Sequence, residues 1–289
     1  MILLLILFLL QIKYFLNKMQ MDNIIQLIII IIIIFCYWII AFYFLKYIHK
    51  FININNLAQA INTYENETNS KLIIIVDDDN NYVLQNIILI NDSETFLNIL
   101  RECNNHNKIL HIIINSTGGN IVESDVIINA ILKHKNIVYS YIPKYAMSAA
   151  TLLALSTTYI HMDLYAYMSP TDPQIELSFD NKHIVSSKML IDYAETYKDS
   201  INISNDIILC ALKAKNLHDD NISSILKILK LKKINKKYHN SICETLGNGK
   251  LPHHAPLYYE KLKNIGFHYI DKIIPLEIID IFDLFEKIL

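Results

Sequence analysis

Short apolar runs alternate with longer amphipathic segments through the middle of the chain, and this alternation constrains the fold most. The expected strands are residues 72–76, 83–90, 109–115, 137–142 and 159–162, and the expected helices are residues 93–101, capped by Ser93, 122–133 and 149–155. Apolar strands connected by helices pair in parallel, because the helices cover both faces of the sheet. The pattern therefore predicts an α/β domain over residues 71–289, mostly helical after Lys188.

A nearly unbroken apolar stretch, residues 24–45, precedes this domain. About 20 apolar residues are enough for a helix to cross a bilayer, so this stretch predicts a transmembrane anchor. The chain then divides into an apolar N-terminal extension (1–23), the anchor (24–45), a polar, asparagine-rich linker (46–70) and the domain (71–289). Residues 51–70 of the linker also have a short apolar helical pattern that is compatible with one helix. Lysines flank the anchor at both ends, so we expect a single-pass membrane protein whose orientation stays open.

Composition and short motifs exclude several classes of function. The net charge of −2 and the lack of a long basic run argue against nucleic-acid binding. The four cysteines have neither C-x-x-C nor metal-ligand spacing, so we expect no structural zinc and no disulfide framework. No G-x-G-x-x-G occurs in the chain, and we therefore expect neither a nicotinamide nor any other cofactor.

Two adjacent glycines, Gly118 and Gly119, follow the expected strand 109–115 in a chain that has only five glycines. Such a pair suits a tight turn whose backbone amides are free to bind an anion, although an ordinary turn is the simpler interpretation. Ser148 stands where strand 137–142 gives way to helix 149–155. A helix N-terminus favours developing negative charge, so the pattern indicates a nucleophilic serine facing an oxyanion hole. The alternative role for this serine is to cap the helix.

Three motifs occur in order: IIINSTGG at residues 112–119, PKYAMSAAT at 143–151 and MSPTDPQ at 168–174. Together they resemble the ClpP-like serine dehydrogenase proteinase family, a membrane-anchored group related to signal peptide peptidase A. The resemblance covers roughly residues 72–289 and implies a ClpP/crotonase-like fold of repeated β-β-α units. It also implies peptide-bond hydrolysis through an acyl-enzyme on Ser148, a peptide or membrane-protein substrate, and assembly into a homo-oligomer.

A serine nucleophile needs a general base, for which Lys198 and His253 are candidates, and Asp172 is a further catalytic candidate. Asp172 falls where ClpP places its histidine, and it could orient a base, form a wall of the site or cap the local turn. Lys198 follows Ser148 at a separation resembling the serine–lysine dyad of signal peptide peptidases, but it lies in a polar segment. His253 matches a histidine in the family's C-terminal T-H-D-Y-P pattern. The sequence leaves the choice open.

Two departures from the family pattern bear on activity. Ala150 stands where the family has glycine, and its Cβ could crowd the helix start or a substrate; Thr117 replaces a proline before the glycine pair. These departures favour a rival hypothesis, a catalytically inactive membrane scaffold or peptide-binding protein. A crotonase-like acyl-CoA enzyme is a third option, but no basic cluster for its phosphates is present.

Overall fold

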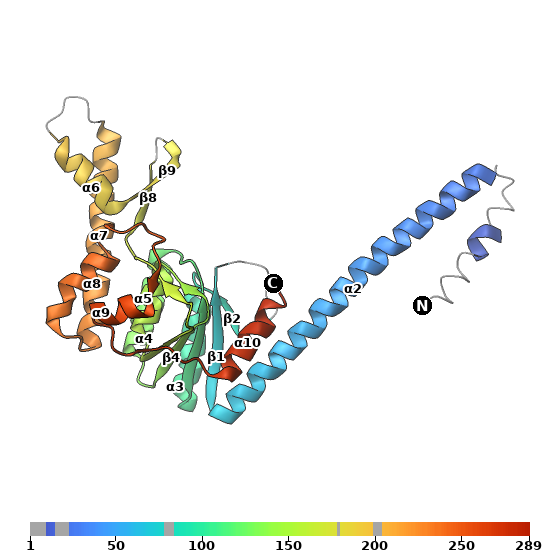
Figure 1. The fold of residues 1–289 in the computed structure, drawn as a ribbon, viewed down its shortest axis with the longest axis horizontal. Helices are drawn as coiled ribbons and strands as arrows, with labels where there is room; N and C mark the ends of the chain where they lie inside the picture. Colours follow the sequence, from blue (N-terminus) through green and yellow to red (C-terminus); the bar gives the residue numbers. More distant parts are fainter. Residues whose placement is uncertain (1–9, 15–22, 78–83, 178–179, 199–203) are drawn as a thin grey trace. The chain divides into compact units, whose positions relative to one another are not determined.

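The computed structural model describes residues 10–14, 23–77, 84–177, 180–198 and 204–289 (Figure 1). The chain divides into two compact units, the first formed by residues 1–56 and the second by residues 57–287. Most of the predicted N-terminal extension lies outside the described residues, as does the first residue of the strand predicted at 83–90.

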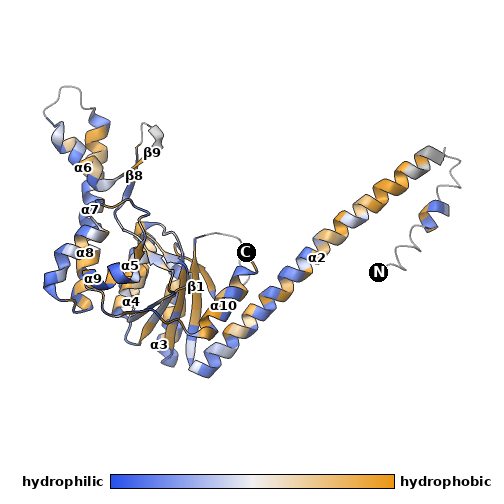
Figure 2. Cartoon of the chain, viewed as in Figure 1, coloured by the Kyte–Doolittle hydropathy of each residue, from blue (hydrophilic) through white to orange (hydrophobic). Residues whose placement is uncertain are grey.

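Helix α2 (Asn23–Thr68) contains the predicted anchor. Within the described residues, it is the one helix that is long and apolar enough to cross a membrane, judged by length and composition. Figure 2 shows its first half as predominantly hydrophobic. Large apolar side chains of this half are exposed, including Trp38 with 64% of its surface accessible. This exposure is what a lipid-facing helix would show, since none of the most apolar stretch of α2 is buried against other described residues.

The segment predicted as a linker continues α2 without interruption to Thr68. Its last turns belong to the second unit, where Leu57, Ile61 and Tyr64 are buried. The spacing of these three side chains, four and then three residues, puts them on one helical face. The short apolar helical pattern within the linker indicated a helix here, but not that this helix would be continuous with the anchor.

Six parallel strands form the central sheet of the described domain. They are β1 (Ser70–Val76), β2 (Ile87–Leu89), β3 (Ile109–Asn115), β4 (Val138–Ile142), β6 (Tyr159–Met162) and β11 (Ile270–Asp271), in the order β11-β6-β4-β3-β1-β2. Every neighbouring pair runs parallel, as the alternating pattern predicts. Strand β11 was not predicted, because two residues are too few to show a periodic pattern.

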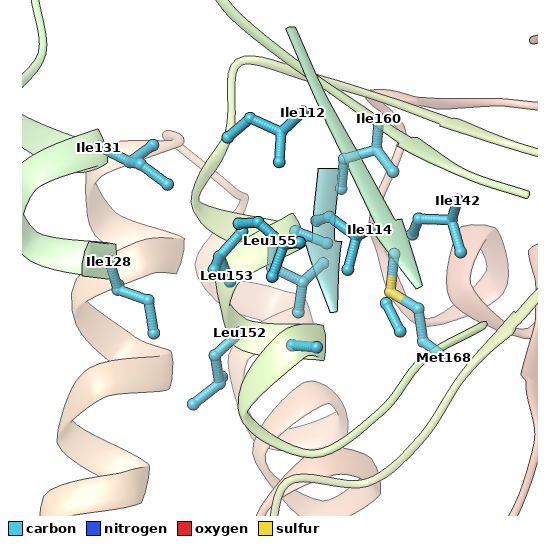
Figure 3. Packing of buried hydrophobic residues seen from close by; sticks show 14 of the residues in the cluster. Ile112, Ile114, Ile128, Ile131, Ile142, Leu152, Leu153, Leu155, Ile160 and Met168 are labelled. Atoms are coloured by element: carbon cyan, nitrogen blue, oxygen red, sulfur yellow. The ribbon is translucent and has the colours of Figure 1, made fainter. Parts of the chain in front are cut away.

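Three helices connect the first strands: α3 (Ser93–His106), α4 (Ile121–Lys133) and α5 (Ala149–Ser156). Asp92 rather than Ser93 caps α3, since its carboxylate accepts a hydrogen bond from the Thr95 amide at 3.0 Å. Side chains of α4 and α5 pack against alternate isoleucines of the strands (Figure 3). Ile112 and Ile114 of β3 are fully buried in this core, which fixes the carboxyl end of β3 next to the start of α5.

The opposite face of the sheet carries a cluster of rings. His111 of β3 lies beside Tyr139 and Tyr141 of β4, and Tyr64 of α2 packs edge-on against it. The hydroxyls of Tyr64 and Tyr141 lie 2.8 and 2.9 Å from the Nδ1 atom of His111. Burial, and to a smaller extent the charge of His161, lower the pKa of His111 to about 4. The imidazole is therefore neutral near pH 7.

The second half of the domain is mostly helical, as predicted, with several short strands. The helices are α6 (Ser187–Thr196), α7 (Asn205–Leu231), α8 (His239–Leu246), α9 (Tyr259–Ile265) and α10 (Leu276–Glu286), with a 3₁₀ turn at Lys236–Tyr238. Strands β8 (Gln174–Leu177) and β9 (Asp180–Ser186) form a hairpin, and β5 (Tyr145–Ala146), β7 (Tyr167–Met168) and β10 (Leu257–Tyr258) form a small sheet. This small sheet brings together the Ser148 segment, the segment that leads to Asp172 and the segment that follows His253.

Candidate active site

The glycine turn begins where β3 ends and is held by a carboxylate at the end of the neighbouring strand, β1. Asp77, directly after β1, accepts hydrogen bonds from the Ser116 hydroxyl and from both the amide and the hydroxyl of Thr117, the latter two at 2.6 and 2.7 Å. Proline has no N–H and no hydroxyl, so it could make neither of the Thr117 contacts. Threonine at this position therefore anchors the turn instead of disturbing it.

Gly118 lies directly against Ser148. Its φ of +112° falls in the region that favours glycine, and a Cβ built on it would lie 2.8 Å from the Ser148 Cβ and 3.0 Å from the Met147 carbonyl oxygen. Any side chain here would therefore push the serine segment away. Gly119 is equally restricted, because its Cβ would collide with the Asn91 side chain, which accepts a hydrogen bond from the Asn120 amide.

Ser148 sits at the N-terminus of α5 in an uncommon backbone conformation, with φ +51° and ψ −121°. Its amide donates to the Ser169 hydroxyl at 2.9 Å, which ties the turn to the segment after β7. The Ser148 hydroxyl makes no capping hydrogen bond, so the structure does not support the helix-capping alternative. Strained residues of this kind cluster at functional sites, where the surrounding contacts hold them in place.

Two backbone amides near Ser148 have no hydrogen-bond partner among the described residues: those of Gly119 and Ala149. The Gly118 amide, by contrast, donates to the Ser116 hydroxyl at 3.1 Å. Gly118 thus provides the close approach to Ser148, and the amide of Gly119 stays available for a ligand. Ala149 is the first residue of α5, so no carbonyl of the helix is positioned to accept a hydrogen bond from its amide. The sequence analysis did not identify Ala149.

His253 and Asp172 form a pair in the same region. The His253 Nδ1 atom lies 3.1 Å from an Asp172 carboxylate oxygen, and the other oxygen accepts a hydrogen bond from the Gln174 side chain at 2.7 Å. Asp172 is 1% exposed. A carboxylate at Nδ1 favours the tautomer whose Nε2 atom can accept a proton. The pairing of β7 with β10, Met168 opposite Leu257, draws these two side chains together from distant parts of the chain.

A cavity of about 650 Å³ unites these groups, since Gly119, Ser148, Ala149 and His253 all line it. Helices α4 and α7 form its long walls. Within the described part of the chain, no group of three or more histidine, cysteine, aspartate or glutamate side chains is arranged to hold a metal ion.

Lys198 is not brought to this cavity. It is exposed, lies two residues beyond the end of α6, and is absent from the residues that line the cavity. A lysine must lose its hydration to act as a base near neutral pH, and an exposed lysine keeps it. The separation in sequence that suggested Lys198 therefore has no counterpart in the geometry.

The crowding considered for Ala150 does not occur, because this residue points into the core and away from the site. The residue is fully buried in the main apolar cluster, together with Leu153, and does not line the cavity. Consecutive residues of a helix point in directions about 100° apart, so Ala150 and the cavity-lining Ala149 face different surroundings. The departure from glycine at this position is thus a matter of packing.

Two supporting residues escaped the sequence analysis. Asp77 orders the glycine turn, and Ser169 holds the Ser148 amide. Asp77 could have been found, because an acidic residue directly after an apolar strand lies at the carboxyl edge of the sheet, where ligands of α/β proteins bind. Ser169 lies in the MSPTDPQ motif, but its contact with the Ser148 amide depends on the pairing of β5 with β7 and could not be predicted from the motif.

The parallel α/β domain sets a strained serine against a glycine turn, which is the arrangement expected from the resemblance to the ClpP-like class of proteins. Residues 18–289 match the model of the ClpP-like SDH-type serine proteinases, and the chain belongs to this family. This membership confirms the resemblance and the fold class predicted from the sequence.

Two curated relatives are uncharacterized proteins of Methanocaldococcus jannaschii. MJ1495 is 28% identical over 69% of this chain and 64% of its own length, so the chain spans a little under two thirds of that relative. MJ0137 is 26% identical over 87% of this chain and 86% of its own length.

Similar solved structures include two mutants of the membrane-bound stomatin-specific protease 1510-N, one of them in complex with a substrate peptide. They are 14% and 15% identical, with TM-scores of 0.45 and 0.44, over 73% of this chain and 85% and 80% of theirs. ClpP1 from Listeria monocytogenes is 14% identical, with a TM-score of 0.41, over 71% of this chain and 91% of its own.

Proposed function

We propose that this chain is a membrane-anchored serine peptidase that hydrolyses peptide bonds through an acyl-enzyme on Ser148. The observation that carries the proposal is the pairing of His253 with Asp172 at the cavity that Ser148 also lines. A serine hydroxyl needs a base to become a nucleophile, and this pair offers one with a defined tautomer. Family membership supports the same class of reaction.

In the proposed mechanism, His253 Nε2 takes the Ser148 proton as the serine oxygen attacks the peptide carbonyl carbon. The carbonyl oxygen becomes an anion, which the free amides of Gly119 and Ala149 stabilise together with the N-terminus of α5. The protonated His253 then gives its proton to the leaving amine as the C–N bond breaks. Water, deprotonated by His253, hydrolyses the ester and releases Ser148.

Asp172 orients His253 and stabilises the imidazolium that forms during attack. Its burial makes this effect strong, since a charge in a low-dielectric site interacts more than one in water. The hydrogen bond from Gln174 fixes the carboxylate in position. Gly118 does not contribute an amide in this scheme; its lack of a side chain permits the contact with Ser148.

Anchoring of the peptidase in a membrane is the second part of the proposal. The apolar half of α2 supports it by its length and by the exposure of its side chains. A single span would confine the domain to one side of the bilayer and place peptides or membrane proteins near that surface within its reach. The composition of the flanking segments does not indicate which side.

A fluorophosphonate probe on the purified full-length protein in detergent tests the proposed chemistry. We expect covalent labelling of Ser148, loss of labelling in Ser148→Ala, and much slower labelling in His253→Gln. Ser241→Ala is the matched control, because Ser241 is exposed on α8 and does not line the cavity. If the folded wild-type protein neither reacts with the probe nor cleaves peptides, the peptidase proposal fails and the inactive scaffold is the better interpretation.

A further inference from the structure

The cavity beside Ser148 is built from two helices whose relative register is fixed by side-chain contacts. Ser224 of α7 donates to Asp125 of α4 at 3.3 Å, and Lys227 of α7 donates to Asn129 of α4. Both residue numbers rise together, so the helices run side by side in the same direction. Asp220, one turn before Ser224, therefore lies across from the first turn of α4, which begins directly after the glycine turn.

The walls of this cavity are apolar near the proposed nucleophile. Ile121, Val122 and Val126 of α4 line it together with Leu217 of α7, and 69% of the Val122 surface is accessible. Apolar side chains left open in a concave site favour a ligand with an extended hydrocarbon portion. This part of the cavity alone would suit any long side chain.

Two acidic groups lie among these apolar side chains and distinguish between long substrate side chains. Asp125 and Asp220 line the cavity, and neither forms an ion pair with any residue of the described chain. Asp125 is held by neutral donors, Ser224 and Asn129, which stabilise its charge without cancelling it. Lys227 also lines the cavity and donates to the Asn129 amide oxygen, and its single positive charge leaves these three side chains with a net charge of −1.

Two buried polar groups in these walls have no hydrogen-bond partner in the described residues. They are the hydroxyl of Ser124, which is 1% exposed, and the side-chain nitrogen of Asn221, which is 5% exposed. Leaving such groups unpaired is costly, and both residues line the cavity, so a ligand that reached them would gain hydrogen bonds. The Ser124 hydroxyl, next to Asp125, can accept from a cationic group, and the Asn221 amide can donate to a peptide carbonyl.

We propose that this cavity is a specificity pocket for a lysine or arginine side chain of the substrate, next to the bond that Ser148 cleaves. The hydrocarbon stem lies against the valine and isoleucine side chains of α4, and the charged end reaches Asp125 and Asp220. The inference rests on the proposed peptidase function, because it assigns the substrate class of the same site. An acidic substrate side chain is excluded by repulsion from the two carboxylates.

Binding to full-length Ser148→Ala in detergent tests the pocket independently of catalysis. Four fluorescent decapeptides of one sequence would differ at a single position, carrying arginine, lysine, norleucine or glutamate. Norleucine matches the lysine stem but has no charge. We expect the arginine and lysine peptides to bind about tenfold or more tightly than norleucine, and glutamate to bind most weakly.

Charge variants on the same background locate the effect. Asp220→Asn should weaken binding of the lysine peptide about tenfold and leave the norleucine peptide unchanged. Asp219→Asn is the matched control, since Asp219 is an exposed neighbour on α7 that does not line the cavity. Equal binding of lysine and norleucine, or equal loss in both variants, overturns the pocket assignment. Probe labelling of the wild type then decides separately whether the peptidase proposal stands.

Discussion

Acidification should destabilise the domain through one buried imidazole, that of His111. Burial lowers its pKa in the folded protein to about 4, against an ordinary value of 6.5. Because the folded-state pKa is the lower one, the unfolded chain takes up the proton first as the pH falls. The stabilising contribution is therefore complete above pH 6.5 and is lost between pH 6.5 and pH 4.

The size of the effect follows from the difference between these two pKa values. One pKa unit corresponds to about 1.4 kcal/mol, so His111 should reduce the free energy of unfolding by about 3 kcal/mol between pH 7 and pH 4. This is a substantial part of the 5–15 kcal/mol that is typical of a folded domain. A protonated Nδ1 would donate to one of the adjacent tyrosine hydroxyls, but a neutral hydroxyl does not replace the hydration that the buried cation loses.

Thermal unfolding followed by circular dichroism, on full-length protein in detergent between pH 4 and pH 8, measures this dependence. His111→Asn is the comparison, because the asparagine oxygen can occupy the position of Nδ1 as an acceptor and does not titrate. Carboxylates that titrate in the same range contribute equally to both proteins and cancel in the difference. If wild type and His111→Asn lose stability in parallel down to pH 4, the reasoning about His111 is refuted.

Three further substitutions or truncations test other parts of the structure. Gly118→Ala forces a side chain against Ser148 at a φ of +112°, so it should cost about 1–3 kcal/mol of stability and strongly reduce probe labelling; normal labelling would contradict the close approach. Ala150→Gly should lower the free energy of unfolding by about 1 kcal/mol in denaturant titrations without raising peptide turnover, because the residue is in the core, and a faster enzyme would show that reasoning to be wrong. The full-length chain should stay in the pellet after carbonate extraction of membranes, whereas a chain lacking residues 1–50, which keeps Leu57 and Ile61, should be soluble; carbonate release of the full-length protein would end the anchor proposal.

The central sheet could be predicted because its signals are local. Strands β3 and β6 occur at the predicted bounds, 109–115 and 159–162, since each is a short run of apolar residues between polar turns. The continuity of α2 from the anchor to Thr68 could not be predicted, because a short apolar pattern of three buried side chains in a polar segment indicates a helix but not what it joins or packs against. Propensity and composition are weak guides where a tertiary contact decides the conformation.

The candidate site, too, could be predicted from the sequence only in part. Ser148 and the glycine pair stand at strand ends, where a sequence pattern indicates exposed backbone and a helix N-terminus. The choice among Asp172, Lys198 and His253 required the contact between β7 and β10, two strands of two residues each. No periodicity reveals a pairing that short, so only the folded chain could bring His253 to Asp172 and leave Lys198 exposed.

In the proposed mechanism, the pairing of β10 with β7 also determines when a newly made chain could become active. A ribosome delivers the nucleophile and the glycine turn long before residue 253, and the histidine reaches its aspartate only after the strand at Leu257–Tyr258 has joined the small sheet. A partly synthesised or truncated chain would thus carry a serine without its base. In the proposed mechanism, peptide cleavage starts only after residues 253–258 have been made and β10 has joined β7.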